Sequence, residues 1–172
     1  SKKKEIDKFF SSFNKDLDIL VNVAAINYTK KIGKISFDEW EKVIATNLSS
    51  YFYIIKKSLD IMNNGGKIVN VSSIAGRNRS LVSGVHYTAS KAAIIGLTRQ
   101  LAFELAPNQI ACNCIQAGVT RTPALEKIPN YEQMVSKAKS NNPHHRLTLT
   151  NDISSITTMI GISYNYWMTG NT

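Results

Sequence analysis

Two side chains that can hold or exchange a proton lie four residues apart at the head of an apolar segment. In the stretch VHYTASKAAIIGLTRQLAFE (85–104), Tyr87 precedes Lys91 by one helical turn, so both face the same side. A free phenol titrates near pKa ~10, too high for ready exchange at neutral pH, and a nearby ammonium lowers that pKa because it favours the phenolate. The pair is therefore either a phenol whose pKa is lowered by the lysine or a surface pair that contributes about a few tenths of a kcal/mol to helix stability.

Three short apolar runs predict the strands that must position this pair. They are LDILVNVAA (17–25), KIVNVSS (67–73) and QIACNCIQA (109–117), rich in branched residues and too short for helices. Helical periodicity separates them, which is the order of a parallel sheet covered by helices on both faces. Ligands of such sheets bind beyond the carboxyl ends of the strands. Those ends fall at 22–26, 72–76 and 117–122.

Two long helices are predicted between the strands. The first spans 36–62, where apolar residues recur at spacings of three and four and Ser36 and Glu39 form a capping-box pattern. The sequence NNGG (63–66) is expected to end it. The second long helix spans 86–106 and is closed by the following proline. The remaining predicted segments are a loop over 74–85, a short helix over 131–142 and a last helix over 152–167, capped by Asp152.

The composition is that of one globular domain. The 172 residues are 43% hydrophobic and 19% charged, which excludes disordered and fibrous chains and favours a single domain over 1–172. No apolar run reaches the ~18–20 residues of a membrane span. No apolar region follows the basic start at Lys2–Lys4, as a secretory signal would require. We therefore expect a cytoplasmic protein with no membrane partner.

The net charge and the two cysteines indicate which partners and metal sites are expected. The net charge is +9, but the lysines are scattered and form no stripe with aromatic residues, so no nucleic-acid partner is expected. A basic α/β module that binds nucleic acid is kept as an alternative. Cys112 and Cys114 face one side of a predicted strand, and two small buried residues are favoured over a metal site, which would need more ligands. We expect no metal.

Six stretches, in order along the chain, resemble the short-chain dehydrogenase/reductase family. They are LDILVNVAA, TNLSSYF, GKIVNVSSIAG, YTASK, IACNCIQAGVTRTP and YWMTGNT. YTASK alone would be weak, since its Tyr–Lys spacing often occurs by chance, but six ordered matches are specific. The resemblance implies a Rossmann-like doubly wound α/β fold and an oxidoreductase that uses NAD or NADP. The segment TPALEKIPN (122–130) is similar to 3-oxoacyl-acyl-carrier-protein reductases and related ketoreductases.

The resemblance implies a role for each of four catalytic residues. Tyr87 would be the general acid in carbonyl reduction or the base in alcohol oxidation. Lys91 would lower the pKa of Tyr87 and hold the nicotinamide ribose. Ser73 would hydrogen-bond the substrate carbonyl oxygen, and the backbone of Asn47 would bind a water in a proton relay. Taken singly, Ser73 could instead satisfy a turn and Asn47 could be a hydrogen-bonded core residue.

The resemblance also implies cofactor contacts at the strand ends. The family's Asn-Asn-Ala-Gly stands here as Asn22-Val23-Ala24-Ala25, and its Pro-Gly as Ala117-Gly118, changes that lower the expectation of tight cofactor binding. The cofactor-binding residues implied are Asn22, Ala24, Ala25, Tyr87, Lys91, Gly118, Thr120 and Thr122.

The expected reaction is NAD(P)-dependent carbonyl reduction or alcohol oxidation on a 3-oxoacyl or similar ketone substrate. An enoyl reductase of the family usually has a wider Tyr–Lys spacing, so the spacing here favours carbonyl chemistry. The segment 123–146 would cover the substrate, and its apolar residues suggest an apolar substrate portion, although core contacts explain them as well. The two long helices resemble those of the family's dimer interface, so we expect a homodimer or homotetramer.

The chain departs from the family at both ends. No glycine-rich phosphate loop precedes Leu17, and the sequence stops where the family's last strand would begin. The interpretation is an internal piece lacking the first strands and the last strand, which is not expected to fold stably alone because the first strand would present an open apolar edge. A catalytically impaired homologue with an interaction role is the alternative function.

Three histidines complete the candidates. His86 is next to Tyr87 and is interpreted as lining the substrate loop or exposed. His144 and His145 are expected to be solvated.

Overall fold

Three parallel strands form one sheet in the order β1, β2, β3. A computed structural model of the protein, which describes residues 2–80, 82–123, 125, 126, 128 and 131–172, contains them. The strands are β1 (Leu17–Asn22), β2 (Met62–Ser73) and β3 (Ala111–Ala117). Leu20 lies opposite Ile68, and Ile68 lies opposite Cys112. The predicted parallel sheet is confirmed, and β1 is at its edge.

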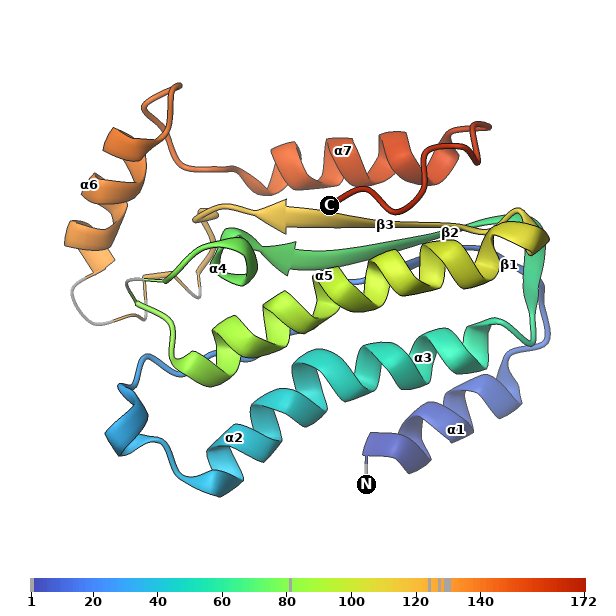
Figure 1. Ribbon diagram of the computed structural model, residues 1–172, viewed down its shortest axis with the longest axis horizontal. Helices are drawn as coiled ribbons and strands as arrows, with labels where there is room; N and C mark the ends of the chain where they lie inside the picture. The colour runs from blue at the N-terminus through green and yellow to red at the C-terminus, as the bar shows by residue number, and fades with distance from the viewer. Residues whose placement is uncertain (1, 81, 124, 127, 129–130) are drawn as a thin grey trace.

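Helices precede, connect and follow these strands. They are α1 (Lys2–Ser12), η1 (Ile32–Lys34), α2 (Phe37–Ile44), η2 (Ala45–Ser49), α3 (Ser50–Ser58), α4 (Ile74–Arg77), α5 (Val85–Leu105), η3 (Ala106–Asn108), α6 (Tyr131–Asn141) and α7 (Thr150–Ile162). Figure 1 shows α7 on one side of the sheet and α3 and α5 on the other. The arrangement confirms a Rossmann-like α/β fold with helices on both faces.

The first long helix begins as predicted and contains an irregular turn. Ser36 accepts the Glu39 N–H at 3.2 Å, and the Glu39 carboxylate accepts the Ser36 N–H at 3.1 Å, so the capping box is confirmed. The segment from α2 through η2 to α3 is continuous, but η2 is π-helical: the N–H of Ser50 bonds to the carbonyl of Ala45, five residues back. Such π-bulges in helices are frequent at functional sites.

The end of that helix was predicted wrongly. The helix stops at Ser58, and the NNGG sequence lies inside β2 rather than after a helix. The register explains this: Leu17 pairs with Met62, but Ile19 pairs with Lys67, so β2 carries extra residues in a bulge. Gly65 supplies the positive φ of 86° that this bulge requires.

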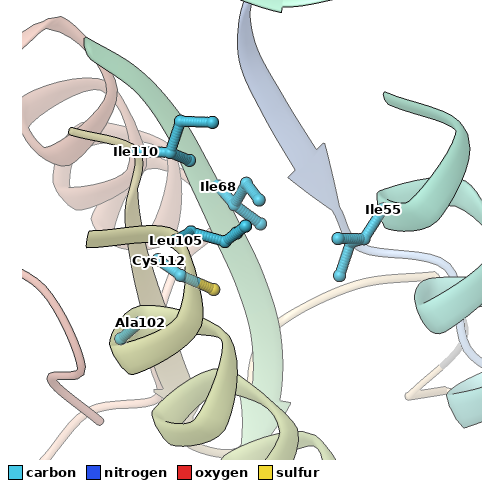
Figure 2. Packing of buried hydrophobic residues seen from close by; sticks show 6 residues of the cluster. All are labelled: Ile55, Ile68, Ala102, Leu105, Ile110 and Cys112. Atoms are coloured by element: carbon cyan, nitrogen blue, oxygen red, sulfur yellow. The ribbon is translucent and has the colours of Figure 1, made fainter. Parts of the chain in front are cut away.

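The main core lies between the sheet and the helices α3 and α5. Figure 2 shows how its buried residues converge from β2, β3, α3 and the end of α5. Cys112 is one of them, and Cys114 is buried in the adjoining cluster with Tyr51, so both are small core residues, as favoured. Burial raises the pKa of the Cys112 thiol to about 12. The residues drawn in Figure 2 are Ile55, Ile68, Ala102, Leu105, Ile110 and Cys112.

The helix α1 was not predicted, and the other terminal helix was predicted too long. A carboxylate of α1, Asp7, accepts the hydroxyl of Tyr53 and pairs with Lys57 at 3.3 Å, both on α3. At the other end, α7 starts two residues before Asp152 and ends at Ile162. Asp152 accepts the Leu149 N–H at 2.8 Å and so caps from inside the first turn. None of the described helices combines the length and apolarity that crossing a bilayer requires.

Candidate active site

A cleft of about 1170 Å³ lies at the carboxyl ends of the strands. Its walls are the loop after β1, the segment after β2, the segment after β3, and α6, which stands beyond the strand arrowheads in Figure 1. Six predicted site residues line this cleft, namely Ala25, Ser73, Tyr87, Gly118, Thr120 and Thr122. Four do not, namely Asn22, Ala24, Asn47 and Lys91. The side chains of the six thus meet at one cleft, whereas the other four residues do not line it, and the roles of all ten stay predictions.

Tyr87 and Ser73 are brought together at the wall of the cleft. Tyr87 is in the first turn of α5, and it is close enough to Ser73, at the end of β2, for the serine to affect the pKa of the phenol. Ser73 also accepts the Ala75 N–H at 3.1 Å and so caps α4. The neighbouring Ser72 instead donates to the Lys91 carbonyl at 2.7 Å and is buried against α5. Strand alternation thus directs Ser73, and not Ser72, to the phenol.

Lys91 is almost completely buried, with 2% of its surface exposed. Pairing of β1 with β2 ends at Asn22 and Asn70. The carbonyl of the next β2 residue, Val71, accepts a hydrogen bond of 2.8 Å from Lys91 Nζ. The ammonium also lies 5.7 Å from the ring centroids of both Tyr51 and Tyr87. Burial lowers the pKa of Lys91 to about 8 because desolvation penalises the charged form.

The predicted pKa direction for Tyr87 is wrong in this structure. Burial raises the pKa of Tyr87, and the neighbouring Ser73 only partly opposes that rise. The physical reason is that the phenol is desolvated while the Lys91 ammonium bonds to Val71 and does not reach the phenol oxygen in a hydrogen bond. Tyr87 is therefore held as a neutral phenol, the form that can donate a proton.

Asn47 connects the loop after β1 to the helix that carries Tyr87. It lies in the π-helical η2 and is fully buried. Its Oδ1 accepts the Ile26 N–H at 2.8 Å, and its Nδ2 donates to the Ile26 carbonyl at 2.9 Å and to Ser90 Oγ at 3.1 Å. Ser90 in turn donates to the Tyr87 carbonyl at 2.7 Å. The side chain is thus the hydrogen-bonded core amide of the simpler interpretation, and a backbone role in proton relay stays a prediction.

Asn22 and Ala24 lie outside the cleft for different reasons. Asn22 is buried at the end of β1, where its Nδ2 donates to Asn70 Oδ1 at 2.9 Å. Asn70 donates in turn to Thr98 Oγ1 at 3.1 Å, so the Asn22 amide belongs to a polar chain that runs from β1 through β2 to α5. Ala24 is exposed. The role of either residue in cofactor binding stays a prediction.

The segment after β3 is tied to the segment before α7. Thr120 forms a parallel bridge with Thr148, the Arg121 N–H donates to the Thr148 carbonyl at 2.9 Å, and the Thr148 N–H donates to the Val119 carbonyl at 3.2 Å. A Cβ at Gly118 would lie 3.0 Å from Thr148 Oγ1, so this glycine allows the two segments to approach. Both segments therefore form a fixed wall of the cleft.

The interpretation of His86 is wrong. The residue is fully buried, and its Nδ1 accepts the N–H of Tyr87 at 2.8 Å, which leaves Nε2 as the buried side-chain atom with no partner in the described part of the chain. Its ring lies 5.9 Å from that of Tyr28, a cleft residue that was not predicted. The glycine at position 84 was a signal in the sequence for a close contact with His86, because a Cβ there would lie 2.4 Å from His86 Cε1. His144 and His145 are exposed, as expected.

The lining of the cleft suits part of a dinucleotide. Its volume exceeds the roughly 300–1000 Å³ of ordinary small-molecule sites, and its lining offers backbone approach at Gly118 and hydroxyls at Thr120 and Thr122, so it fits the reactive end of a nicotinamide dinucleotide and a substrate. Among the described residues, no group of three or more His, Cys, Asp or Glu side chains is placed to hold a metal ion. A smaller cavity of about 490 Å³, lined by Arg77, Arg99 and Gln116 among others, contains none of the predicted site residues.

Comparisons with known proteins agree with this architecture. A family model described as enoyl-(acyl carrier protein) reductase matches residues 1–172. The chain is 30% identical to human (3R)-3-hydroxyacyl-CoA dehydrogenase over 168 residues, which is 96% of this chain and 63% of the relative. It is 32% identical to acetoacetyl-CoA reductase from an Acinetobacter strain, covering 91% of this chain and 62% of the relative. The chain thus spans less than two thirds of the length of these relatives.

Solved structures of similar proteins have the same architecture. A 3-oxoacyl-[acyl-carrier protein] reductase from Brucella melitensis superposes with a TM-score of 0.88 at 27% identity, covering 100% of this chain and 67% of that one. A second reductase of that description from the same organism, with bound NAD, superposes with a TM-score of 0.79 at 30% identity, covering 99% of this chain and 63% of that one.

Proposed function

This chain belongs to the short-chain dehydrogenase/reductase family, and from that premise we propose that the full-length protein is an NAD(P)-dependent oxidoreductase that interconverts a carbonyl and an alcohol. The observation that carries the proposal is that Tyr87 and Ser73 line the same cleft, with the buried Lys91 ammonium 5.7 Å from the centroid of the phenol ring.

In the direction of reduction, Tyr87 donates its proton to the carbonyl oxygen of the substrate. Its raised pKa keeps the proton on the phenol until an oxygen of developing negative charge accepts it. Ser73 hydrogen-bonds the same oxygen and stabilises the charge that develops there. A bound nicotinamide supplies the hydride.

Lys91 and Asn47 support the phenol rather than react. The Lys91 ammonium stabilises the phenolate that remains after proton transfer, because it is held 5.7 Å from the ring in a site with little competing water. Asn47 fixes the turn that carries Tyr87 through Ser90. Its backbone is proposed to hold a relay water at the π-helical turn, where hydrogen bonding departs from the α-helical pattern.

The cofactor is NAD or NADP. Residues of this chain proposed to contact its nicotinamide half are at the ends of β1 and β3 and on α5; they are Asn22, Ala24, Ala25, Tyr87, Lys91, Gly118, Thr120 and Thr122. Four of these contact the same cleft as Tyr87, which supports the assignment, namely Ala25, Gly118, Thr120 and Thr122.

The proposed substrate is a 3-oxoacyl thioester or a similar ketone. Leu125, Ile128 and Met134 line the cleft and offer an apolar surface for an acyl chain. Other residues of the TPALEKIPN segment, at 124, 127, 129 and 130, lie outside the described residues. Although the matching family model is described as an enoyl reductase, the four-residue spacing of Tyr87 and Lys91 favours carbonyl chemistry.

A homodimer or homotetramer in the cytoplasm is part of the proposal. Phe37, Phe52 and Phe103 on α2, α3 and α5 expose 72%, 54% and 79% of their surfaces. Exposed aromatic side chains on the helices that resemble the family's dimer interface support a second copy covering them. Light scattering on the full-length protein tests this, and a strict monomer contradicts it.

The decisive experiment measures reduction of acetoacetyl-CoA by the full-length protein with NADH and with NADPH. Oxidation of either dinucleotide that depends on the substrate supports the proposal. Dinucleotide binding in a fluorescence titration without any turnover would instead favour the impaired homologue with an interaction role.

A further inference from the structure

Lys91 is a buried cation without an acidic partner. Its surface is 2% exposed, and no Asp or Glu forms an ion pair with it in the part of the chain that the structure describes. The ammonium has three N–H donors, and among the described residues it makes a single hydrogen bond, to the Val71 carbonyl at 2.8 Å. A buried charge destabilises a fold unless other groups compensate it. Further contacts must therefore replace the water that Nζ has lost.

Two tyrosine rings lie against this ammonium. Lys91 Nζ is over the rings of Tyr51 and Tyr87, 5.7 Å from the centroid of each. The face of an aromatic ring is negative and attracts a cation within about 6 Å of its centroid, most strongly where water is excluded. Tyr87 is the proposed proton donor, so the ring whose contact with Lys91 has no other part in the reaction is that of Tyr51.

Tyr51 is held behind the cleft, in the first turn of α3 and directly after the π-helical η2. Its surface is 1% exposed, it does not line the cleft, and it packs with Ile94 of α5 and Cys114 of β3. Its hydroxyl donates to the same Val71 carbonyl as Lys91, at 3.3 Å. That distance exceeds the usual range of about 2.5–3.0 Å for such a bond, so the ring makes the stronger contact with the site.

The titratable groups that face Lys91 supply no charge of their own at neutral pH. They are Tyr51 of α3, Tyr87 of α5 and Cys114 of β3, and burial raises the pKa of all three. Each is therefore neutral at about pH 8, where burial places the pKa of Lys91. The positive charge is thus held by one carbonyl and by the faces of two neutral rings.

We propose that Tyr51 is a positioning residue, whose ring face keeps Lys91 charged and directed at Tyr87. The role toward Tyr87 rests on the proposed function, because it is there that Lys91 stabilises a phenolate. The contact between Tyr51 and Lys91 is independent of that function. If the ring face attracted the ammonium less, the buried Lys91 would lose its proton at a lower pH.

The test changes the charge on the ring face and keeps its size. In the full-length protein, Tyr51→Phe is compared with phenylalanines that carry one, two or three ring fluorines at position 51, introduced by nonsense suppression. Fluorine withdraws electron density from the ring face and so weakens its attraction for a cation. The matched control is the same series at Tyr53 on the same helix, whose ring centroid lies 5.2 and 5.8 Å from the ammonium groups of Lys3 and Lys57.

Two measurements follow the charge on Lys91. The decline of turnover above about pH 8 should move to lower pH with each fluorine at position 51, by about 0.5–1 unit over the series. The rise of the free energy of unfolding with pH should begin lower by the same amount, because the folded chain releases the Lys91 proton earlier while the unfolded chain still holds it.

The variants without fluorine and at the control position should change little. Tyr51→Phe keeps the ring and should lower kcat less than about twofold, since the bond it removes is long. The Tyr53 series should leave the pH of both transitions at the wild-type value, because that ring does not contact Lys91. In Lys91→Met, fluorination at position 51 should not alter the pH dependence of unfolding.

Several results would overturn the inference. If neither measurement followed the number of fluorines, Tyr51 would be a packing residue only. An equal trend in the Tyr53 series or in Lys91→Met would show that the shift does not arise from the contact with Lys91. A shift in unfolding without one in turnover would refute the role toward Tyr87. If the full-length protein reduced no ketone, the proposed function would fail, and the unfolding measurement alone would decide whether Tyr51 holds the charge on Lys91.

Discussion

The two ends of α5 bury side chains to the same degree but of opposite kinds. Near the cleft the buried residues are His86, Ser90 and Lys91, whereas near the end of the helix they are Ala102 and Leu105. The polar end is possible because pairing of β1 stops at Asn22 and the Val71 carbonyl accepts hydrogen bonds from the side chains of Lys91 and Tyr51. The apolar end packs on the fully paired part of the sheet. Strand length therefore decides where a helix on this sheet can carry chemistry.

The difference has a cost at the cleft end. Buried polar groups destabilise a fold unless they are hydrogen-bonded, and His86 Nε2 has no partner among the described residues. The core end needs only close packing. We therefore expect substitutions at the cleft end to change turnover more than stability, and substitutions at the core end to do the reverse.

The largest effect is expected for Tyr87→Phe. Removing the hydroxyl deletes the proposed proton donor and should lower kcat about 10³-fold or more, near the upper part of the range for general acid catalysis. The apolar body of the ring remains, so the free energy of unfolding should change by less than about 1 kcal/mol. Steady-state kinetics and urea unfolding of the full-length protein measure both. Tyr164→Phe, at a fully exposed tyrosine, is the control, and wild-type turnover in Tyr87→Phe refutes the proposed mechanism.

Leu105→Ala should reverse that pattern at the other end of the helix. The side chain is buried in the main core with Ile68 and Cys112, and its truncation leaves a cavity that should lower the free energy of unfolding by about 2–5 kcal/mol. The kcat per folded molecule should stay within about twofold, because this residue does not line the cleft. A large fall in kcat of the folded protein would show that the two ends of α5 are coupled.

Lys91→Met should lower kcat about 100-fold, because the phenolate left by Tyr87 loses its adjacent charge. The pH dependence sharpens the test. The pKa of Lys91 falls from 10.5 to about 8 on folding, so wild-type turnover should decline as pH rises above about 8. Between pH 8 and 10.5 the unfolded chain binds more protons at this residue than the folded chain. The free energy of unfolding should therefore rise with pH in that window relative to Lys91→Met. If turnover and the free energy of unfolding rose or fell together across this pH window, the prediction would be wrong.

Asn47→Ala should give the smallest and most mixed effect. The change removes both hydrogen bonds to Ile26 and the bond to Ser90, and an unpartnered buried backbone group costs about 1–3 kcal/mol. Since the turn that carries Tyr87 is loosened, kcat should also fall about tenfold. Thermal unfolding and kinetics of Asn47→Ala, with Asn47→Asp as the variant that keeps the Oδ1 acceptor, measure the two effects. Loss of stability alone would limit Asn47 to a structural role.

Local signals in the sequence were sufficient where the interactions are local. The capping box of Ser36 and Glu39 and the extent of α5 need only neighbours in the chain, and both were predicted. The NNGG sequence was misinterpreted because its glycines serve a bulge between β1 and β2, which depends on a partner 45 residues away. The environment of His86 was missed for the same reason, since Tyr28 is distant in sequence.

The sequence by itself determined the parallel α/β fold, the family, and the end of the sheet at which Ser73 and Tyr87 meet. These follow from hydrophobic periodicity and from residue types at fixed spacing, which are properties of the chain alone. Only the tertiary structure decided the electrostatics: that Tyr87 is a desolvated phenol with a raised pKa, and that Lys91 is buried with a lowered one. Burial and charge pairing depend on which distant segments pack together, and spacing along the chain does not contain that information.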